Sequence, residues 1–574
     1  MKRYHFFFVV LAFSLTTLSL AQSGIPLLNP SIQGLYHVES VDELQSRDAM
    51  QLLFTPTPPP GGMVTNIAEF NRMQGVLITF RSGFGIPYNL IAEMAEDVTL
   101  YTIVTGAAQE TTVRTLYQNA GVNLSNCQFV YAPSDSYWTR DYGPWFIKSD
   151  SGYVAIVDFP YNRPRPNDNN VPVVMSSYLG IPLFGMNLIH TGGNYMTDGM
   201  GISASTTLVQ TENPTLSLTQ IQQYVQNYLG VHTYHLNVDP LGQYIEHIDC
   251  WGKFLDVDKI LIGEVPPSHP RYLNYEAVAS YYATSISSYG TPYQVFRVYS
   301  PDGQPYTNSL ILNNKVLVPI VSSASAAVWN APALAVYQQA MPGYEVLGFM
   351  QASNAPWQST DALHCRTKGV ADIRLLDIRH LPLSGNIPAQ NGFEIRARIQ
   401  AYADSGLVMD SVRLVYRVNG GNWSSLQMVQ DTARDFVAMI PAQGNGSEVD
   451  YYVSAKDSTG RKETHPFIGG FDPHSFTVTG YTGLDGSSRN ELKISVYPNP
   501  ATDYTFLRFH LSTVSDASLV VMDMGGRIVR ETKLHSMTPG EQFWKLDLKG
   551  IEKGSYVINI ISNLGKQTAK LVVL

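Results

Sequence analysis

The chain is poor in charged residues, which make up 15% of its 574 residues, against roughly 25% in an average soluble protein. Basic residues are the scarcer kind: 38 Lys and Arg stand against 47 Asp and Glu, so the formal net charge is -9. A protein that binds nucleic acid needs a basic surface for the phosphates, and the sequence therefore argues against a nucleic-acid partner. Tyrosine and proline are abundant instead, with 34 of each, as is typical of an extracellular protein rich in strands and loops.

Cysteine is nearly absent. The three cysteines are Cys127, Cys250 and Cys365, whereas a disulfide scaffold has an even and denser set. Hydrophobic cores must therefore stabilise the fold, and the odd number leaves at least one thiol free for chemistry. The sequence has no CxxC or HxxxH spacing that would suit zinc, and we expect neither a metal nor a cofactor.

Long apolar runs are also missing, except at the N-terminus. Lys2 and Arg3 precede the apolar stretch Phe6 to Leu20, and Ser19-Leu20-Ala21 has the small-x-small pattern of a cleavage site, as in a secretory signal peptide. A membrane anchor is the alternative, but the run is shorter than the roughly 20 residues that span a bilayer. We expect a secreted or cell-surface protein without a transmembrane segment.

Composition divides the rest of the chain, which is too long for one core. A Pro-rich run from Pro56 to Gly62 closes a linker or pro-segment, short β runs replace mixed elements beyond Val370, and a Gly/Ser stretch follows Thr482. The expected order is a signal peptide (1–21), a linker or pro-segment (22–65), an α/β catalytic domain (66–372), an immunoglobulin-like β-sandwich (373–481), a linker (482–490) and a small β-sandwich (491–574).

The α/β part repeats one pattern of strand, turn, strand, helix and strand. Around Asn308, the run Leu310 to Leu312 meets the hairpin pair Asn313-Asn314, and a second strand, a helix and the strand Tyr344 to Phe349 follow. Similar units start near Trp138, Asn194 and His247, with helix N-caps expected at Ser217 and Ser268. Residues 76–132 with a strand near Cys365 supply a fifth unit. Such repetition favours a closed ring of ββαβ units over a doubly wound sheet.

Three segments place polar side chains among apolar neighbours: Trp138-Thr-Arg-Asp141, His247-Ile-Asp249 and Asp361-Ala-Leu-His364-Cys365. If His247 to Phe254 is a strand, alternation turns His247 and Asp249 to one face and Cys250 to the other. A His and an Asp at this spacing are, in general, more often a surface or satisfied polar pair.

Recurrence favours a catalytic interpretation. Asp141, Asn194, His247 with Asp249, and Asn308 each lie on or beside the first strand of a unit, so a closed ring would bring them together. Two carboxylates can grip a planar guanidinium, a thiolate can attack its carbon, and a histidine can move the protons. A cysteine protease would leave the second carboxylate without a role.

Six segments resemble the peptidylarginine deiminases that bacteria secrete, a family of the guanidino-modifying or pentein superfamily. They are Ser136-Tyr-Trp-Thr-Arg-Asp-Tyr142, Tyr161-Asn-Arg-Pro-Arg-Pro-Asn-Asp168, Thr191-Gly-Gly-Asn-Tyr-Met-Thr-Asp198, His247-Ile-Asp-Cys-Trp-Gly252, Pro305-Tyr-Thr-Asn-Ser309 and Thr360-Asp-Ala-Leu-His-Cys-Arg366. The resemblance runs from about 65 to 480. It implies a five-bladed α/β propeller, an immunoglobulin-like domain, and activity without calcium on arginine-containing peptides or proteins.

The resemblance also implies roles for individual residues. Cys365 is the nucleophile, His247 the general acid and base, and Asn308 a support for the thiol. The residues implied to bind substrate are Asp141 and Asp249 on the guanidinium, Trp138, Tyr244 and Ile245 along the side chain, and Arg163 with Arg165 on a terminal carboxylate. An extended Arg163-Pro-Arg165 would send both guanidinium groups the same way; otherwise the pair belongs to a solvated surface loop.

Two further motifs bear on substrate and destination. Asp141-x-Gly143-Pro144 is similar to the agmatine deiminases of the same superfamily, so an agmatine or free-arginine deiminase is the alternative. A non-catalytic adhesin is a third possibility, against which the intact set of polar residues argues. Val496-Tyr-Pro-Asn-Pro500 and Lys570-Leu-Val-Val-Leu574 resemble the type IX sorting domain, which implies the type IX secretion machinery as a partner and removal of the module on export.

Ending the chain near Thr482 should leave the deiminase folded and active, because a linker separates the modules. The truncated enzyme should accumulate in the periplasm, as measured by citrulline formation in periplasmic and medium fractions. Normal amounts of the truncated protein in the medium would contradict the sorting role of the tail.

Overall fold

The computed structural model describes residues 54–403, 405–479, 494–497, 499–511, 515–537, 540–562 and 565–574. The signal peptide expected at 1–21, most of the segment 22–65 and the linker expected at 482–490 lie outside these residues. Within the described part of the chain, none of the helices has the length and apolarity needed to cross a membrane.

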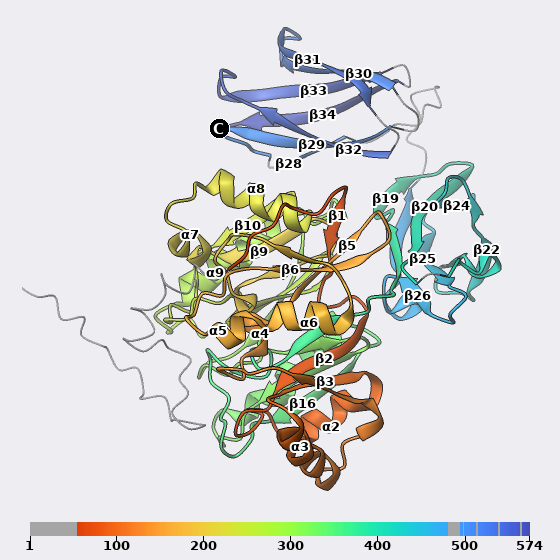
Figure 1. The fold of residues 1–574 in the computed structure, drawn as a ribbon. Coiled ribbons are helices and arrows are strands. Elements are labelled where there is room, and N and C mark those ends of the chain that lie inside the picture. Colours follow the sequence, from red (N-terminus) through yellow and green to blue (C-terminus); the bar gives the residue numbers. More distant parts are fainter. Residues whose placement is uncertain are drawn as a thin grey trace, which may run out of the picture.

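Five small sheets form the region from β1 to β17 (Figure 1). The first contains β1 (Val64–Asn66), β5 (Trp145–Ser149), β6 (Val154–Asp158) and β7 (Leu183–Gly185), with α5 (Pro166–Asn169) and α6 (Val171–Leu179) before β7. The second contains β8 (Met196–Thr197), β9 (Ile202–Thr206) and β10 (Thr233–Asn237), with α7 (Leu208–Glu212) and α8 (Leu218–Leu229) before β10.

The third sheet contains β11 (Gly252–Asp256), β12 (Lys259–Glu264) and β13 (Gln294–Tyr299), with α9 (Tyr272–Thr284) before β13. The fourth contains β14 (Leu310–Leu312), β15 (Lys315–Ile320) and β16 (Glu345–Met350), with α10 (Asn330–Ala340) before β16. The fifth joins β17 (Lys368–Ala371) to β2 (Met73–Thr79), β3 (Thr99–Val104) and β4 (Cys127–Tyr131), with α2 (Tyr88–Asp97) and α3 (Ala107–Asn119) as crossovers.

Each sheet repeats the same pairing. The first strand of the unit runs antiparallel to the second, and the strand after the helix runs parallel to the second. Parallel strands need a crossover between them, which the helices supply. In the fifth sheet, β17 from the end of the region pairs with β2 from its beginning, so the repeat expected from the sequence is present and the last unit is assembled from both ends.

Local signals located several elements correctly. Ser217 caps α8 in a capping box with Gln220, and Gly230 ends this helix in the left-handed conformation. Asn313 turns the β14–β15 hairpin with a φ of 54°. The cap expected at Ser268 is wrong, because α9 begins only at Tyr272 and Arg271 precedes it without a side-chain cap. The segment from Pro266 to Arg271 forms turns instead.

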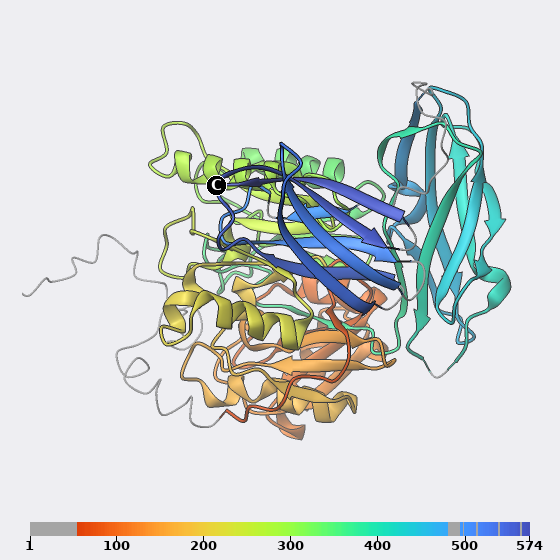
Figure 2. The same cartoon turned by 90° about the horizontal axis from the view of Figure 1, so that it is seen from above.

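The chain continues into two regions that, among the described residues, contain strands and two short 3-10 turns but no α-helix (Figures 1 and 2). In the first, β18 (Leu376–His380), β20 (Gly392–Ala401), β24 (Asp435–Pro441) and β23 (Val429–Gln430) form one sheet. The other sheet contains β19 (Gly385–Pro388), β27 (His474–Thr479), β25 (Glu448–Lys456), β21 (Arg413–Val418) and β22 (Ser424–Gln427), with β26 (Lys462–His465) on β25. Both sheets contribute to one hydrophobic core.

The last region has its own core and two sheets. One contains β28 (Ser495–Tyr497), β29 (Tyr504–Leu511) and β32 (Gly540–Asp547), and the other β31 (Ile528–Met537), β30 (Ser515–Asp523), β33 (Gly554–Ser562) and β34 (Gly565–Val573). It contacts the five-sheet region, where Arg508 donates to the Ser288 carbonyl at 3.0 Å.

A cluster of histidines, two of them buried and one half-buried, lies where the two-sheet region meets the five-sheet region. His380 is 2.8 Å from the Tyr451 hydroxyl, and His465 Nδ1 is 3.0 Å from His474 Nε2. The ring of Tyr289, from the five-sheet region, packs edge-on against His474. Burial lowers the pKa of His380 to about 4 and that of His465 to about 3, so these rings are neutral at pH 7.

Acid should destabilise this contact. The pKa of a histidine in the unfolded chain is about 6.5, so the unfolded state takes up protons first, and stability is lost as the pH falls below that value. The side chain introduced by His380→Gln cannot be protonated. Between pH 7.5 and 5, we therefore expect the free energy of unfolding of this variant, measured with urea, to fall by about 2 kcal/mol less than that of the wild type. His535→Gln, at a side chain that is 71% exposed, is the control, and equal pH dependence of both variants would contradict the assignment.

Candidate active site

One candidate residue from each unit lies at a recurrent position, just before the first strand of that unit. Asp141 lies in the short helix α4 (Thr139–Tyr142) before β5, and Asn194 ends the 3-10 turn η2 (Gly192–Asn194) before β8. Asp249 lies in the 3-10 turn η3 (Ile248–Cys250) before β11. Asn308 and Cys365 stand shortly before β14 and β17. The five units therefore each contribute a polar residue from the same point of the repeat.

Cys365 is fully buried, and its sulfur is surrounded by polar groups. Asn308 Nδ2 lies 3.2 Å from Cys365 Sγ, and the thiol points at Asp249 Oδ2 over 3.8 Å. Asn308 Oδ1 accepts from the backbone N–H groups of His364 and Cys365 at 3.0 and 3.3 Å. The amide of Asn308 thus fixes both the backbone and the sulfur of the thiol residue.

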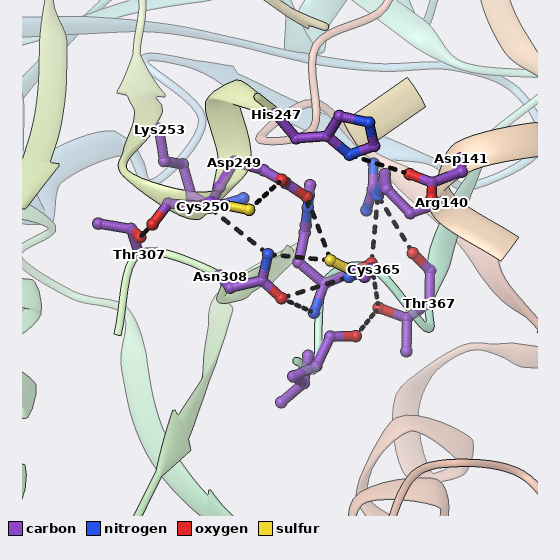
Figure 3. Close-up of polar contacts among 12 residues, drawn as sticks. Arg140, Asp141, His247, Asp249, Cys250, Lys253, Thr307, Asn308, Cys365 and Thr367 are labelled. Carbon is purple, nitrogen blue, oxygen red and sulfur yellow. Dashed lines mark hydrogen bonds and ion pairs between the residues drawn. The ribbon is translucent and has the colours of Figure 1, made fainter. Parts of the chain in front are cut away.

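His247 and Asp141 lie together on a second side of the site (Figure 3). His247 Nδ1 is 3.5 Å from Asp141 Oδ1, and both side chains are buried. A Cβ atom on Gly193 would come within 2.6 Å of each of these two atoms. The glycine therefore allows η2 to approach the pair closely, while Asn194 accepts from the Thr206 N–H at 2.8 Å and holds η2 against β9.

The strand expected from His247 to Phe254 is wrong in its first half. Residues 248–250 form the 3-10 turn η3, and β11 begins only at Gly252. Alternation therefore does not turn Cys250 away: its sulfur lies 3.6 Å from Asp249 Oδ1. Both carboxylate oxygens of Asp249 thus have a thiol nearby, and the choice between the two thiols needs another argument than strand alternation.

The two arginines near the site are buried, with exposures of 8% for Arg163 and 4% for Arg165, so the pair is not part of a solvated surface loop. The guanidinium of Arg165 lies 5.1 Å from the Trp138 ring centre, and Trp138 packs in one cluster with Tyr137 and Cys365. The extended geometry expected for the pair is wrong, because Arg165 N donates to Arg163 O at 2.8 Å and closes a three-residue turn.

Tyr244 and Ile245 have different surroundings. Ile245 is buried in the hydrophobic core around Trp251. Tyr244 is half-buried, and although burial is what chiefly raises its pKa, Thr360, Asp361 and Arg163 also act on it. Tyr244 is therefore within electrostatic reach of Arg163 and of the loop before Cys365.

Arg366 and Asp361 brace the loop that carries Cys365. The guanidinium makes two hydrogen bonds to Asp361, at 2.9 and 2.7 Å, and donates to three backbone carbonyls. It also lies between the rings of Tyr137 and Trp357, 5.2 and 5.0 Å from their centres. Removing one partner of such a buried pair typically costs about 3–5 kcal/mol, so the loss of either side chain would strongly destabilise the loop.

Sequence reasoning missed the carboxylate of Glu69. Its oxygens lie 2.8 Å from Arg140 NH2, 2.9 Å from Lys253 Nζ and 2.6 Å from His364 Nε2, and Glu69 Oε1 also accepts from the Ile311 N–H. A cavity of about 70 Å³ borders this cluster. The sequence signal for this site was a charged residue, Glu69, between two apolar residues, Ala68 and Phe70, which are buried in the structure.

The electrostatics favour the protonated form of both thiols. Burial, followed by the carboxylates of Asp249, Asp361 and Asp141, raises the pKa of Cys365 well above its usual value. Burial and Asp249 do the same for Cys250. A cation held by these carboxylates would cancel their effect on Cys365, so the site favours a positively charged ligand. Among the described residues, no cluster of His, Cys, Asp and Glu could hold a metal ion.

The comparisons with known proteins agree with this chemistry. The model of the Porphyromonas-type peptidyl-arginine deiminase family matches residues 68–370, and that of the secretion system C-terminal sorting domain matches residues 495–574. A type IX sorting domain of this kind directs export to the cell surface or the medium through the secretion machinery.

Individual relatives are more distant. A curated protein of Legionella pneumophila named "Putative agmatine deiminase" is 27% identical over 246 residues, which is 38% of this chain and 69% of that protein. A Yersinia pestis protein of the same name is 25% identical over 39% of this chain and 72% of its own length. The solved agmatine deiminase of Enterococcus faecalis is 17% identical with a TM-score of 0.46, covering 55% of this chain and 99% of that one. With more than half of its length matched by the family model, the chain belongs to the Porphyromonas-type peptidyl-arginine deiminase family.

Proposed function

We propose that the protein is an exported deiminase that hydrolyses the guanidinium of peptidyl arginine, preferably at a C-terminus, to citrulline and ammonia. One observation carries the proposal: Cys365 Sγ lies beside Asn308 and Asp249, with the His247–Asp141 pair on a second side. The five sheets act as the five blades of a pentein propeller, and the two-sheet region after them as an immunoglobulin-like domain.

The carboxylates of Asp141 and Asp249 hold the guanidinium, because planar N–H groups pair with carboxylates bidentately. The bound cation lowers the pKa of Cys365 by offsetting the neighbouring negative charges. The Cys365 thiol then gives its proton to the His247 imidazole, and the thiolate, to which Asn308 donates a hydrogen bond, adds to the guanidinium carbon. Trp138 packs against the arginine side chain.

His247 moves the protons of both half-reactions. In the first, the imidazolium gives a proton to the departing nitrogen, the C–N bond breaks, and ammonia leaves a thiouronium on Cys365. In the second, the neutral imidazole takes a proton from water, the hydroxide adds to the same carbon, the C–S bond breaks, and the hydroxyl proton passes to solvent, where it converts ammonia into ammonium. The products are citrulline, ammonium and the restored thiolate, so one water is consumed per turnover.

Preference for a terminal carboxylate rests on the buried arginine pair. A buried cation is costly unless an anion or acceptor compensates it. Within the described part of the chain, Arg163 Nε has no hydrogen-bond partner, and its NH1 donates only to the neighbouring Asn162 carbonyl. A carboxylate of the substrate would supply the missing charge, whereas agmatine has none.

The second candidate is an agmatine or free-arginine deiminase, which the names of the curated relatives favour. The motif Gly143-Pro144 does not add to it. A Cβ at Gly143 would come within 2.3 Å of the Thr139 carbonyl and 2.7 Å of the Lys368 side chain. Close packing therefore accounts for this glycine whatever the substrate is.

Cys365→Ser should abolish citrulline formation, whereas Cys250→Ser should leave kcat within about threefold. The two thiols form a matched pair, because both are buried and both lie beside Asp249. Mass spectrometry of enzyme quenched during turnover should find the adduct on Cys365, and an adduct on Cys250 would overturn the assignment.

Peptides that end in free arginine should exceed the same peptides amidated at the C-terminus by at least about tenfold in kcat/KM, because each charge-assisted hydrogen bond contributes about 1.5–3 kcal/mol. Exchanging both Arg163 and Arg165 for alanine should remove the difference and leave the amidated peptide nearly unaffected. If the wild type instead prefers agmatine, the second candidate is correct.

A further inference from the structure

His364, the residue directly before Cys365, is held between two carboxylates. Its Nδ1 lies 2.7 Å from Asp249 Oδ2, and its Nε2 lies 2.6 Å from Glu69 Oε2. The histidine is only 4% exposed. One of its two partners is thus Glu69, which also contacts Arg140 and Lys253. The other is Asp249, which lies beside Cys365.

The two contacts fix the number of protons in this chain of groups. A neutral imidazole has one N–H donor, and an ionised carboxylate can only accept. If the histidine were neutral and both carboxylates were ionised, only one ring nitrogen could make a hydrogen bond. Hydrogen bonds at both ring nitrogens therefore require one additional proton. Although burial raises the pKa of Glu69, His364, Lys253 and Arg140 together hold it well below its usual value. Glu69 is therefore ionised, and the additional proton lies between His364 Nδ1 and Asp249 Oδ2.

Several charges face this shared proton. Burial and then the Arg140 cation lower the pKa of His364. Lys253 and Lys368 also border the cavity beside the cluster, and Cys365 lies on the other side of Asp249. In contrast to these cations, the ionised carboxylate of Glu69 favours a proton on His364. Its position is fixed by Arg140, Lys253 and the Ile311 N–H.

We propose that Glu69 and His364 are positioning residues that make Asp249 available to a guanidinium, by taking over its proton when the cation arrives. This rests on the proposed function, in which Asp249 holds the substrate. The Oδ2–H bond of Asp249 breaks and the Nδ1–H bond of His364 forms. The total charge of the three groups stays the same, and no proton has to leave the site.

The role of Glu69 follows from charge balance. After the transfer, the imidazolium lies between two carboxylates and is stabilised by both. With a neutral group at position 69, the imidazolium loses one of its two partners. The proton then remains on Asp249, and a guanidinium can bind only if that proton is released to solvent. Glu69 thus converts a binding step that would release a proton into one that does not.

A purely structural role for the cluster makes a different prediction. Glu69→Gln keeps an oxygen that can accept from His364 Nε2 but removes the charge. Lys253→Met removes a contact of the same carboxylate and leaves both contacts of His364 in place. Both variants should lower stability, whereas only Glu69→Gln should change the protons exchanged on binding.

The experiment is calorimetric titration of the Cys365→Ala protein with a peptide that ends in arginine, in buffers of different ionisation enthalpy. Near pH 7, the Glu69→Gln variant should release about one more proton per peptide bound than its parent, and its Kd should rise about tenfold for each unit of pH decrease. The Lys253→Met variant should match the parent. Equal proton release by all three proteins would overturn the proposal.

Failure of the proposed function has a separate signature. In that case the wild type forms no citrulline from any guanidinium substrate and the Cys365→Ala protein binds none. The 15N signals of His364, identified by subtraction of a His364→Gln spectrum, then test the shared proton without a ligand. A signal of hydrogen-bonded Nδ1 in the parent that becomes the signal of a nitrogen without a hydrogen bond in Asp249→Leu supports the shared proton. An Nδ1 without a hydrogen bond in the parent overturns the shared proton.

Discussion

The structure of the site depends on one carboxylate that is mostly, but not fully, buried. Glu69 lies in the loop between β1 and β2, yet its partners come from four other places in the chain: Arg140 before β5, Lys253 in β11, Ile311 in β14 and His364 before β17. A buried charge is tolerated only when it is paired and hydrogen-bonded. The pairing of Glu69 therefore requires that these elements meet at one point, which is also the point where Asp249 and Cys365 are held.

Close backbone approach is the second constraint. The residues beside Asp141 can contact η2 only because Gly192 and Gly193 have no side chain; a Cβ at Gly192 would come within 2.0 Å of the Arg140 carbonyl. The glycines thus contribute to the chemistry without a functional group of their own. They allow a carboxylate and an imidazole from different units to lie 3.5 Å apart in a buried environment.

Local signals predicted the elements, and distant contacts determined the site. The hairpin at Asn313-Asn314 and the capping box at Ser217 are decided by residues next to one another, so the sequence predicts them well. The turn η3 is only three residues long, and the alternating pattern of the sequence predicts a strand in its place. The Glu69 cluster could not be predicted, because three of its partners lie 184, 242 and 295 residues away along the chain. The recurrence of polar residues before the first strands was the one sequence pattern that anticipated their convergence.

The pairing of β17 with β2 also determines when the site can exist. β2 is among the first strands of the region to leave the ribosome, and its antiparallel partner β17 is the last. Cys365 stands just before β17, so the thiol, its Asn308 support and the His364 bridge are assembled only when the whole region has been synthesised and closed. A nascent or partly translocated chain therefore carries the separate parts of the site without bringing them together.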